Sequence, residues 1–359
     1  MPIVRGKEQV VALYHGAAGR HWVVPTFCAE NQTTIEAVLA ACQAKAAGLG
    51  TRVPVTIAMT GRYSHRAQAV FYAGSRNPDT GFELFLGDCE VLARPGGDYP
   101  DVDVLTHFDH GQFDADAGRL AGDLSRFSSV MYDASAAPWE VNLAKTAEFV
   151  ATHGDDVLVE GAADEIVDAS GGVRGLLTSP ERAEEFVART GVDMVVANLG
   201  TEHRASAADL RYVPEAAQAI SDRIGPRLVL HGASSVPLHQ LKGLFYDGVC
   251  KVNIWTTLER DTSPELFRRM VEHADAVAGP DAATLAGEGL LGPDAPVAGG
   301  ADIAYFTTAW RQEVVHAGMQ RIVAGYLDLW YRSWPGAEPL GTCPLSAEVP
   351  AEHLSRSPS

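Results

Sequence analysis

Eight short apolar runs, rich in β-branched residues, recur along the 359-residue chain with helical patterns between them. The runs cover residues 22–29, 53–59, 102–109, 129–135, 156–161, 194–200, 227–233 and 249–254. Strands that alternate with helices pair in parallel, and eight of them favour closure into a (β/α)8 barrel, the TIM barrel fold. The alternative is an open doubly wound sheet. It is less favoured because polar residues end many different runs, whereas an open sheet gathers its site at one switch point.

The stretches between the runs carry helix start and stop signals. The segment SPERAEEFVARTG begins with Ser179 as a predicted N-cap, has Pro180 in its first turn and ends in a glycine. The segments TTIEAVLAACQAKAAG and VPEAAQAISDRIG also end in glycine. These signals support the alternation of strands and helices that a barrel requires.

The domain organisation follows from where this alternation holds. We expect a single barrel domain over residues 1–334, with loop insertions at about 74–100 and 259–302. Loops on the carboxyl-terminal face of a barrel usually cover its site, so we expect these insertions there. Residues 303–334 predict a long amphipathic helix with an aromatic stripe, a C-terminal helical extension. Residues 335–359 are rich in Pro and Ser and predict a disordered tail.

Charge and cysteine content exclude several classes of partner. The net charge is -18 and no block of Lys and Arg is present, which argues against nucleic acid as a partner. No run approaches the roughly 20 apolar residues of a membrane span, and the first residues lack the apolar core of a signal peptide. The five cysteines are widely separated and form no CxxC pair, so reduced thiols are expected. We therefore expect a cytoplasmic protein.

Three histidines and an aspartate stand where the apolar runs end. Asp109 and His110 follow VDVLTHF, His203 follows MVVANLGTE, and His231 follows RLVL. In a parallel barrel these side chains would converge on one mouth, where three imidazoles could hold Zn²⁺ and leave a fourth position open. A zinc amidohydrolase would ordinarily carry a His-x-His pair at the end of the first strand. That strand reads WVVPTFCA, so metallohydrolysis is disfavoured.

The segments around these residues resemble the class II, metal-dependent fructose-bisphosphate and tagatose-bisphosphate aldolases. The resemblance spans about residues 20–258, and the joint order and spacing of its motifs make it fairly specific. The matching segments are VPTFCAENQTTIEAVLAA, VLTHFDHG, SSVMYDAS, VLVEG, TSPERAEEFVARTGVDMVVANLGTEH, LVLHGASSVP and GVCKVNI.

The resemblance implies a role for each strand-end residue. Asp109 corresponds to the catalytic acid/base of the family's DHG motif, and the adjoining His110 to a metal ligand. His203 of the GTxH motif and His231 of the HGxS motif complete the implied metal shell, with Zn²⁺ as the expected ion. A Lewis-acidic metal chelated by ketone and hydroxyl oxygens would stabilise an enediolate without a Schiff base.

The resemblance also implies a substrate-binding set. Gly232, Ser234 and Thr256 match the family's phosphate contacts, and small residues at the last two strand ends are the usual barrel phosphate cradle. Asn253 matches the asparagine that touches the enediolate. Arg204 stands where the family has glycine, beside a phosphate position, and could add a charge-assisted contact.

One departure from the family pattern removes a carboxylate. The family's VExExG reads VEGAAD, so Ala162 replaces a glutamate that handles protons or binds metal, while Glu160 is retained. A nearby carboxylate would have to substitute for it, and the candidates are Asp164, Glu165 and Asp168. Glu160 and Glu165 are therefore expected to be accessory carboxylates.

Two further departures alter the surroundings of the expected metal. Trp255 stands where a small or acidic residue is usual, and the segment GRYSHRAQ at 61–68 replaces a glycine-rich turn. This segment adds Arg62, His65 and Arg66 near the barrel mouth. We expect a substrate preference that differs from fructose 1,6-bisphosphate.

Two other polar residues have a structural interpretation. His107 lies three residues before His110, and strand alternation would turn it to the opposite face, so a core or supporting group is expected. Lys251, within the last run, is the kind of residue that forms a Schiff base in metal-independent barrel aldolases. That role is disfavoured because the metal constellation already supplies the electron sink.

The resemblance thus implies a lyase that makes or breaks a carbon-carbon bond of a ketose phosphate with a donor resembling dihydroxyacetone phosphate. Two alternatives remain open: a catalytically silent accessory subunit, suggested by Ala162, and a metal-dependent sugar-phosphate epimerase or isomerase. The expected partners are a small sugar or sugar phosphate and further copies of the chain. A homodimer or higher homo-oligomer is predicted from the aromatic stripe of residues 303–334 and from the resemblance.

Overall fold

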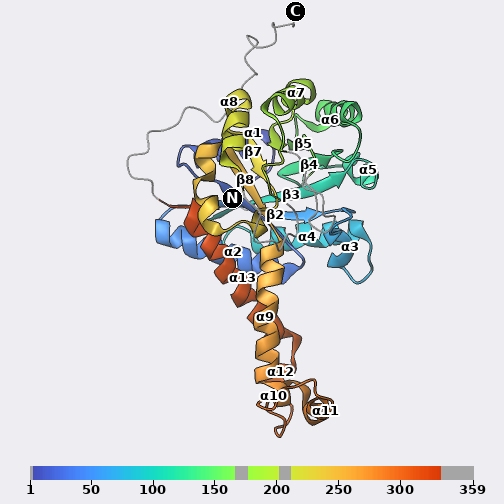
Figure 1. Cartoon of the computed structure of the whole chain (residues 1–359), viewed down its shortest axis with the longest axis vertical. Coiled ribbons are helices and arrows are strands. Elements are labelled where there is room, and N and C mark those ends of the chain that lie inside the picture. The colour runs from blue at the N-terminus through green and yellow to red at the C-terminus, as the bar shows by residue number, and fades with distance from the viewer. Residues whose placement is uncertain (1–2, 166–176, 202–211, 333–359) are drawn as a thin grey trace, which may run out of the picture.

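The structure is a computed structural model that describes residues 3–165, 177–201 and 212–332. Eight parallel strands pair in chain order and close into a barrel, because β1 pairs with both β2 and β8 (Figure 1). The predicted TIM barrel is confirmed, and the open sheet is excluded. Each apolar run corresponds to one strand, and β2, β3 and β5 extend one to three residues beyond their runs. The strands are β1 Val24–Cys28, β2 Val53–Thr60, β3 Val102–Gln112, β4 Ser129–Asp133, β5 Leu158–Ala162, β6 Met194–Val196, β7 Leu228–Leu230 and β8 Val249–Ile254.

Helices surround the barrel, and α7 and α8 end at the predicted glycines, whereas α2 continues past Gly48 and stops at Gly50. Ser179 accepts a hydrogen bond from the backbone N–H of Arg182 at 3.2 Å, and the helix stops at Gly191 in a left-handed conformation. The helices and 3₁₀ turns around the strands are α1 Lys7–Ala18, α2 Gln32–Leu49, α3 Gln68–Tyr72, α4 Pro78–Leu92, α5 Ala117–Leu120, α6 Trp139–His153, α7 Pro180–Thr190, α8 Pro214–Ile224, η2 Ala233–Ser235 and η3 Leu238–Asp247. Among the residues described, no helix is long and apolar enough to cross a bilayer.

The region after the last strand forms an arm that leaves the barrel. Helix α9 Thr256–Glu272 carries the chain outward, and α13 Thr308–Trp330 brings it back beside α9 (Figure 1). The short helices α10 Ala274–Ala278, α11 Asp281–Gly287 and α12 Ile303–Phe306 form the distant tip. The insertion at 259–302 was expected as an irregular loop over the site. It begins instead within a helix and extends away from the barrel, so it does not cover the mouth.

The C-terminal part of the aromatic stripe is buried within the chain itself. Tyr326, Leu327 and Trp330 of α13 are at most 3% exposed, because the helix lies against α2 and the outside of the barrel. The indole N–H of Trp330 donates to the carbonyl of Leu241 at 2.9 Å. This C-terminal part of the stripe therefore belongs to the core, whereas Tyr305, Phe306 and Trp310 at its start remain partly or fully exposed. The predicted subunit interface stays a prediction.

Candidate active site

A cavity opens at the carboxyl ends of β1, β2, β3, β7 and β8. Its walls combine strand-end residues with the loop after β2 and the turns after β7 and β8. The residues that line it are Cys28, Thr60, Tyr63, His65, Arg66, Gln68, Asp109, His110, His231, Gly232, Ser234, Asn253, Ile254, Trp255 and Thr256. Most of the site residues predicted from the sequence therefore share one cavity on the face where barrel enzymes react.

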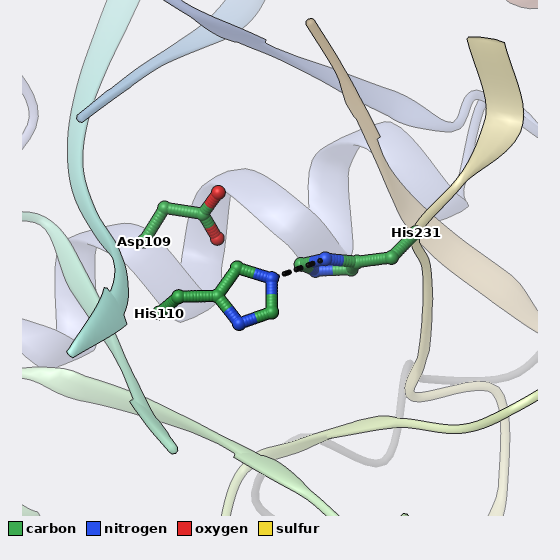
Figure 2. Close-up of side chains that lie close together, drawn as sticks. All are labelled: Asp109, His110 and His231. Carbon is green, nitrogen blue, oxygen red and sulfur yellow. Dashed lines mark hydrogen bonds between the residues drawn. The ribbon is translucent and has the colours of Figure 1, made fainter. Parts of the chain in front are cut away.

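Two of the three predicted histidine ligands meet in this cavity. Nε2 of His110 lies 3.1 Å from Nδ1 of His231, and both rings are buried (Figure 2). Two nitrogens bound at about 2.0–2.1 Å to one tetrahedral zinc ion lie about 3.3–3.4 Å apart, so the pair is spaced to share an ion. Together with Asp109, their ligand atoms all lie within 4.8 Å of one another. His203 and Arg204 lie outside the described residues.

A carboxylate behind His110 fixes the orientation of its ring. Nδ1 of His110 lies 2.7 Å from Oδ2 of Asp133, at the end of β4. Burial alone would raise the pKa of Asp133, but the hydrogen bond and charge of His110 hold that pKa below its usual range. A carboxylate on the far nitrogen commonly orients a metal-binding imidazole and makes it more basic. The donor set therefore fits a divalent metal.

The direction of His110 depends on a distortion of β3. Successive side chains of a strand point to opposite faces, and Phe108 points outward, where it packs against Phe82 and Phe127. Regular alternation would send His110 outward as well, while His107 and Asp109 point inward. The register of β3 against β4 shifts between Phe108 and Gly111, and His110 has a φ of 45°. This irregularity places two consecutive residues, Asp109 and His110, in the same cavity.

Asp109 lies beside the histidine pair and is held by neighbours on two other strands, β1 and β8. Its Oδ1 accepts a hydrogen bond from Nδ2 of Asn253 at 2.9 Å, and its Oδ2 lies 3.5 Å from the Cys28 thiol. Burial would raise the pKa of Asp109, but the nearby His110, His107 and His231 hold it well below its usual range. The carboxylate is thus fixed at the wall of the cavity, where it can accept a proton from a bound hydroxyl.

An ion pair fills the barrel interior beneath Asp109. Nζ of Lys251 lies 2.6 and 2.9 Å from the two carboxylate oxygens of Glu160, and 3.2 Å from Nε2 of His107. His107 also contacts Ser129 through Nδ1 at 2.7 Å. All of these side chains are buried. Lys251 is committed to this pair. His107 is a supporting core group, as predicted, but it lies in the barrel interior on the same side as His110 and not on the opposite face.

The accessory carboxylates do not reach the cavity. Glu160 is occupied with Lys251 in the barrel interior, and Glu165 is exposed after β5. Asp164 binds Arg182 at 2.5 Å and Thr178 at 2.9 Å, while Asp168 lies outside the described residues. Within the described part of the chain, none of these carboxylates lines the cavity in place of the glutamate that Ala162 removes.

The last two strand ends bring the residues predicted to bind phosphate into one cavity. Gly232 has a φ of 69°, a left-handed conformation that favours glycine, and it opens the turn η2 that contains Ser234. Thr256 begins the 17-residue helix α9, whose first turn receives no side-chain cap. The Thr257 hydroxyl donates to the carbonyl of Ser234 at 3.2 Å and ties the two turns together. Free N–H groups at a helix start suit an anion such as phosphate.

Three residues of the site were not identified from the sequence. Tyr63, in the loop after β2, stacks flat on His110 with ring centroids 4.0 Å apart and an interplanar angle of 2°. Asp133 is a polar residue at the end of a strand, and this same pattern identified Asp109, His110 and His231 in the sequence. Cys28 also ends a strand, but a single cysteine in the sequence does not by itself indicate a functional site. Arg62 is exposed and lies outside the cavity lining, whereas His65 and Arg66 belong to it.

Comparisons with known proteins were made after this geometry. Residues 8–297 match the family model described as fructose-bisphosphate aldolase class-II. The chain is 34% identical over 265 residues to the D-tagatose-1,6-bisphosphate aldolase subunit GatY of Klebsiella oxytoca, which covers 71% of this chain and 83% of the relative.

Two solved structures share the fold. The fructose-bisphosphate aldolase Fba of Campylobacter jejuni has a TM-score of 0.67 at 19% identity, covering 91% of this chain and 97% of its own. The YdjI aldolase of Escherichia coli K12 has a TM-score of 0.63 at 21% identity, covering 92% and 98%. At these identities the likeness concerns the barrel and its arrangement of helices.

Proposed function

Because the chain belongs to the class II fructose-bisphosphate aldolase family, as its motifs predicted, and is therefore a lyase, we propose that it makes or breaks a carbon-carbon bond of a ketose phosphate with a divalent metal, most simply Zn²⁺. The observation that carries this proposal is the 3.1 Å approach of the His110 and His231 nitrogens beside Asp109. His110, His231 and His203 would hold the ion, which supplies Lewis-acid polarisation of the ketose carbonyl.

The residues around the ion would carry out proton transfer and substrate binding. Asp109 takes the proton from the substrate hydroxyl that becomes the aldehyde, and returns it in the direction of bond formation. Asn253 holds Asp109 and faces the same cavity, where it is placed to contact the reacting oxygens. Gly232, Ser234 and Thr256, joined by Arg204, bind the phosphate of a donor that resembles dihydroxyacetone phosphate.

Donor activation can be tested without an acceptor. Metal-loaded protein should exchange the α-proton of dihydroxyacetone phosphate with deuterium from solvent, which nuclear magnetic resonance detects directly. A chelator should abolish the exchange, and restoring Zn²⁺ should recover it, because the carbonyl must be polarised before the proton leaves. Absence of exchange with metal bound would mean that dihydroxyacetone phosphate is not the donor.

We also propose a homo-oligomer, with the arm as its contact surface. The arm exposes Phe267 (70%), Leu290 (68%) and Ile303 (71%), large apolar side chains that a second copy of the chain could cover. Sedimentation should therefore give a dimer or larger species at micromolar concentration, and Phe267→Asp with Ile303→Asp should dissociate it. A single-chain species for the unmodified protein would exclude this proposal.

A cytoplasmic location is proposed as well. The four cysteines within the described ranges, Cys28, Cys42, Cys89 and Cys250, are all buried free thiols. Free buried thiols suit a reducing compartment.

A further inference from the structure

Arg66 is the single Arg or Lys among the described residues that line the cavity, and a carboxylate already holds its charge. Its Nε lies 3.0 Å from each carboxylate oxygen of Glu30, and its NH2 donates to the same group. Glu30 follows β1, its side chain is 9% exposed, and it also accepts from Nε2 of Gln68 at 3.0 Å. A fork-on-fork pair of this kind is fixed in geometry and electrically neutral.

A second carboxyl group, that of Glu259, also lies in the electrostatic environment of Arg66 and Glu30. Glu259 lies one turn into α9, and burial together with the charge of Glu30 raises its pKa to about 7, although Arg66 acts in the opposite direction. A phosphate group brought to this part of the mouth would meet a paired arginine and two carboxyl groups.

The unsatisfied polar atoms of the cavity suit neutral hydroxyl groups. The amide of Asn253 donates to Asp109 through Nδ2, while its Oδ1 is buried without a partner in the described structure. Nε1 of Trp255 is likewise buried without a partner. A hydroxyl can donate to the amide oxygen and accept from the indole, whereas a phosphate dianion has no proton for Asn253.

We infer that the natural substrate is a ketose with a single phosphate, on the donor end, and with hydroxyl groups but no phosphate on the other end. Glu30 is the residue that excludes a second phosphate, since it neutralises Arg66. This inference rests on the proposed aldolase function, and it departs from the bisphosphates in the names of the family and of the Klebsiella relative.

The test compares fructose 1-phosphate with fructose 1,6-bisphosphate as substrates of the metal-loaded full chain. The monophosphate should have a kcat/KM at least about tenfold higher, since the second phosphate would lose its hydration without gaining a cation to pair with. Glu30→Gln frees Arg66 and should raise kcat/KM for the bisphosphate relative to the monophosphate by about tenfold, mainly through KM. The double variant Glu30→Gln/Arg66→Gln should lose this gain.

A matched control uses another arginine-carboxylate pair. Arg189 is bound by Glu140 at 2.6 Å between α6 and α7, outside the cavity. Glu140→Gln makes the same change of charge and breaks this pair, although Arg189 keeps Glu185 at 2.8 Å, and it should leave the ratio of the two substrates unchanged. A gain equal to that of Glu30→Gln would mean that net charge alone is responsible, and it would overturn the role of Glu30.

Binding gives a readout that does not depend on turnover. Hexitol 1-phosphate and hexitol 1,6-bisphosphate, the reduced and uncleavable sugars, can be titrated calorimetrically into the metal-loaded protein. The monophosphate should bind more tightly, and tighter binding or faster cleavage of the bisphosphate would overturn the inference alone. Loss of dihydroxyacetone phosphate exchange together with failure to cleave either sugar would overturn the proposed function and the inference with it.

Discussion

Replacing His231 by alanine should lower bound zinc to well below one ion per chain and reduce aldol turnover at least about 100-fold. Removing a side chain that supports a metal ligand lowers metal affinity or activity by about 10–100-fold, and removing the ligand itself should lower them further. The imidazole of His231 lies 3.1 Å from that of His110, so its removal leaves one nitrogen where two could share the ion. Metal analysis by mass spectrometry and a coupled cleavage assay measure the two effects.

His21 provides the matched control for this experiment. It is also a buried histidine, stacked on Phe245 at 4.8 Å and in contact with the Tyr246 hydroxyl at 3.1 Å, but it lies outside the cavity. His21→Ala should keep full metal occupancy. Full occupancy in each of His110→Ala, His203→Ala and His231→Ala would contradict the site itself.

Replacing Asp109 by alanine should leave metal bound but lower carbon-carbon turnover by roughly 10²–10⁴-fold, the usual contribution of a general acid or base. Its oxygens already receive contacts from Asn253 and Cys28, which hold the carboxylate against the cavity wall. Metal content and turnover should be measured on the same preparation. Asp109→Asn, which keeps the shape of the side chain, should show the same separation of the two effects.

The position of Asp109 makes this comparison decisive. Its oxygens also lie within 4.8 Å of the histidine nitrogens, close enough for a metal ligand. A parallel loss of metal and turnover would assign it to the metal shell instead of proton transfer. Asp164→Asn serves as the control, because Asp164 also follows a strand but is bound to Arg182 and Thr178 outside the cavity.

The sequence was sufficient for the barrel and for most of its mouth. Hydrophobic periodicity and helix caps are local properties, and eight alternations leave little choice but a closed parallel barrel. Once the barrel is known, residues at strand ends share one face, which places Asp109, His231 and Asn253 together. Local patterns were less informative about the arm. Its residues 278–300 resemble a loop in composition, yet α11 forms there and the whole segment projects outward.

By itself, the sequence determined the strand order, the family and the chemical types that meet at the mouth, because these depend on residues close together in the chain. Only the tertiary structure decided the orientation of these side chains and their partners. The irregularity of β3 turns His110 into the cavity against strand alternation, and it depends on the pairing with β4. The pairing of Arg66 with Glu30 joins the segments that follow β2 and β1, and it neutralises the single arginine among the described residues that line the cavity. Such effects arise from contacts between distant segments, and no local pattern contains them.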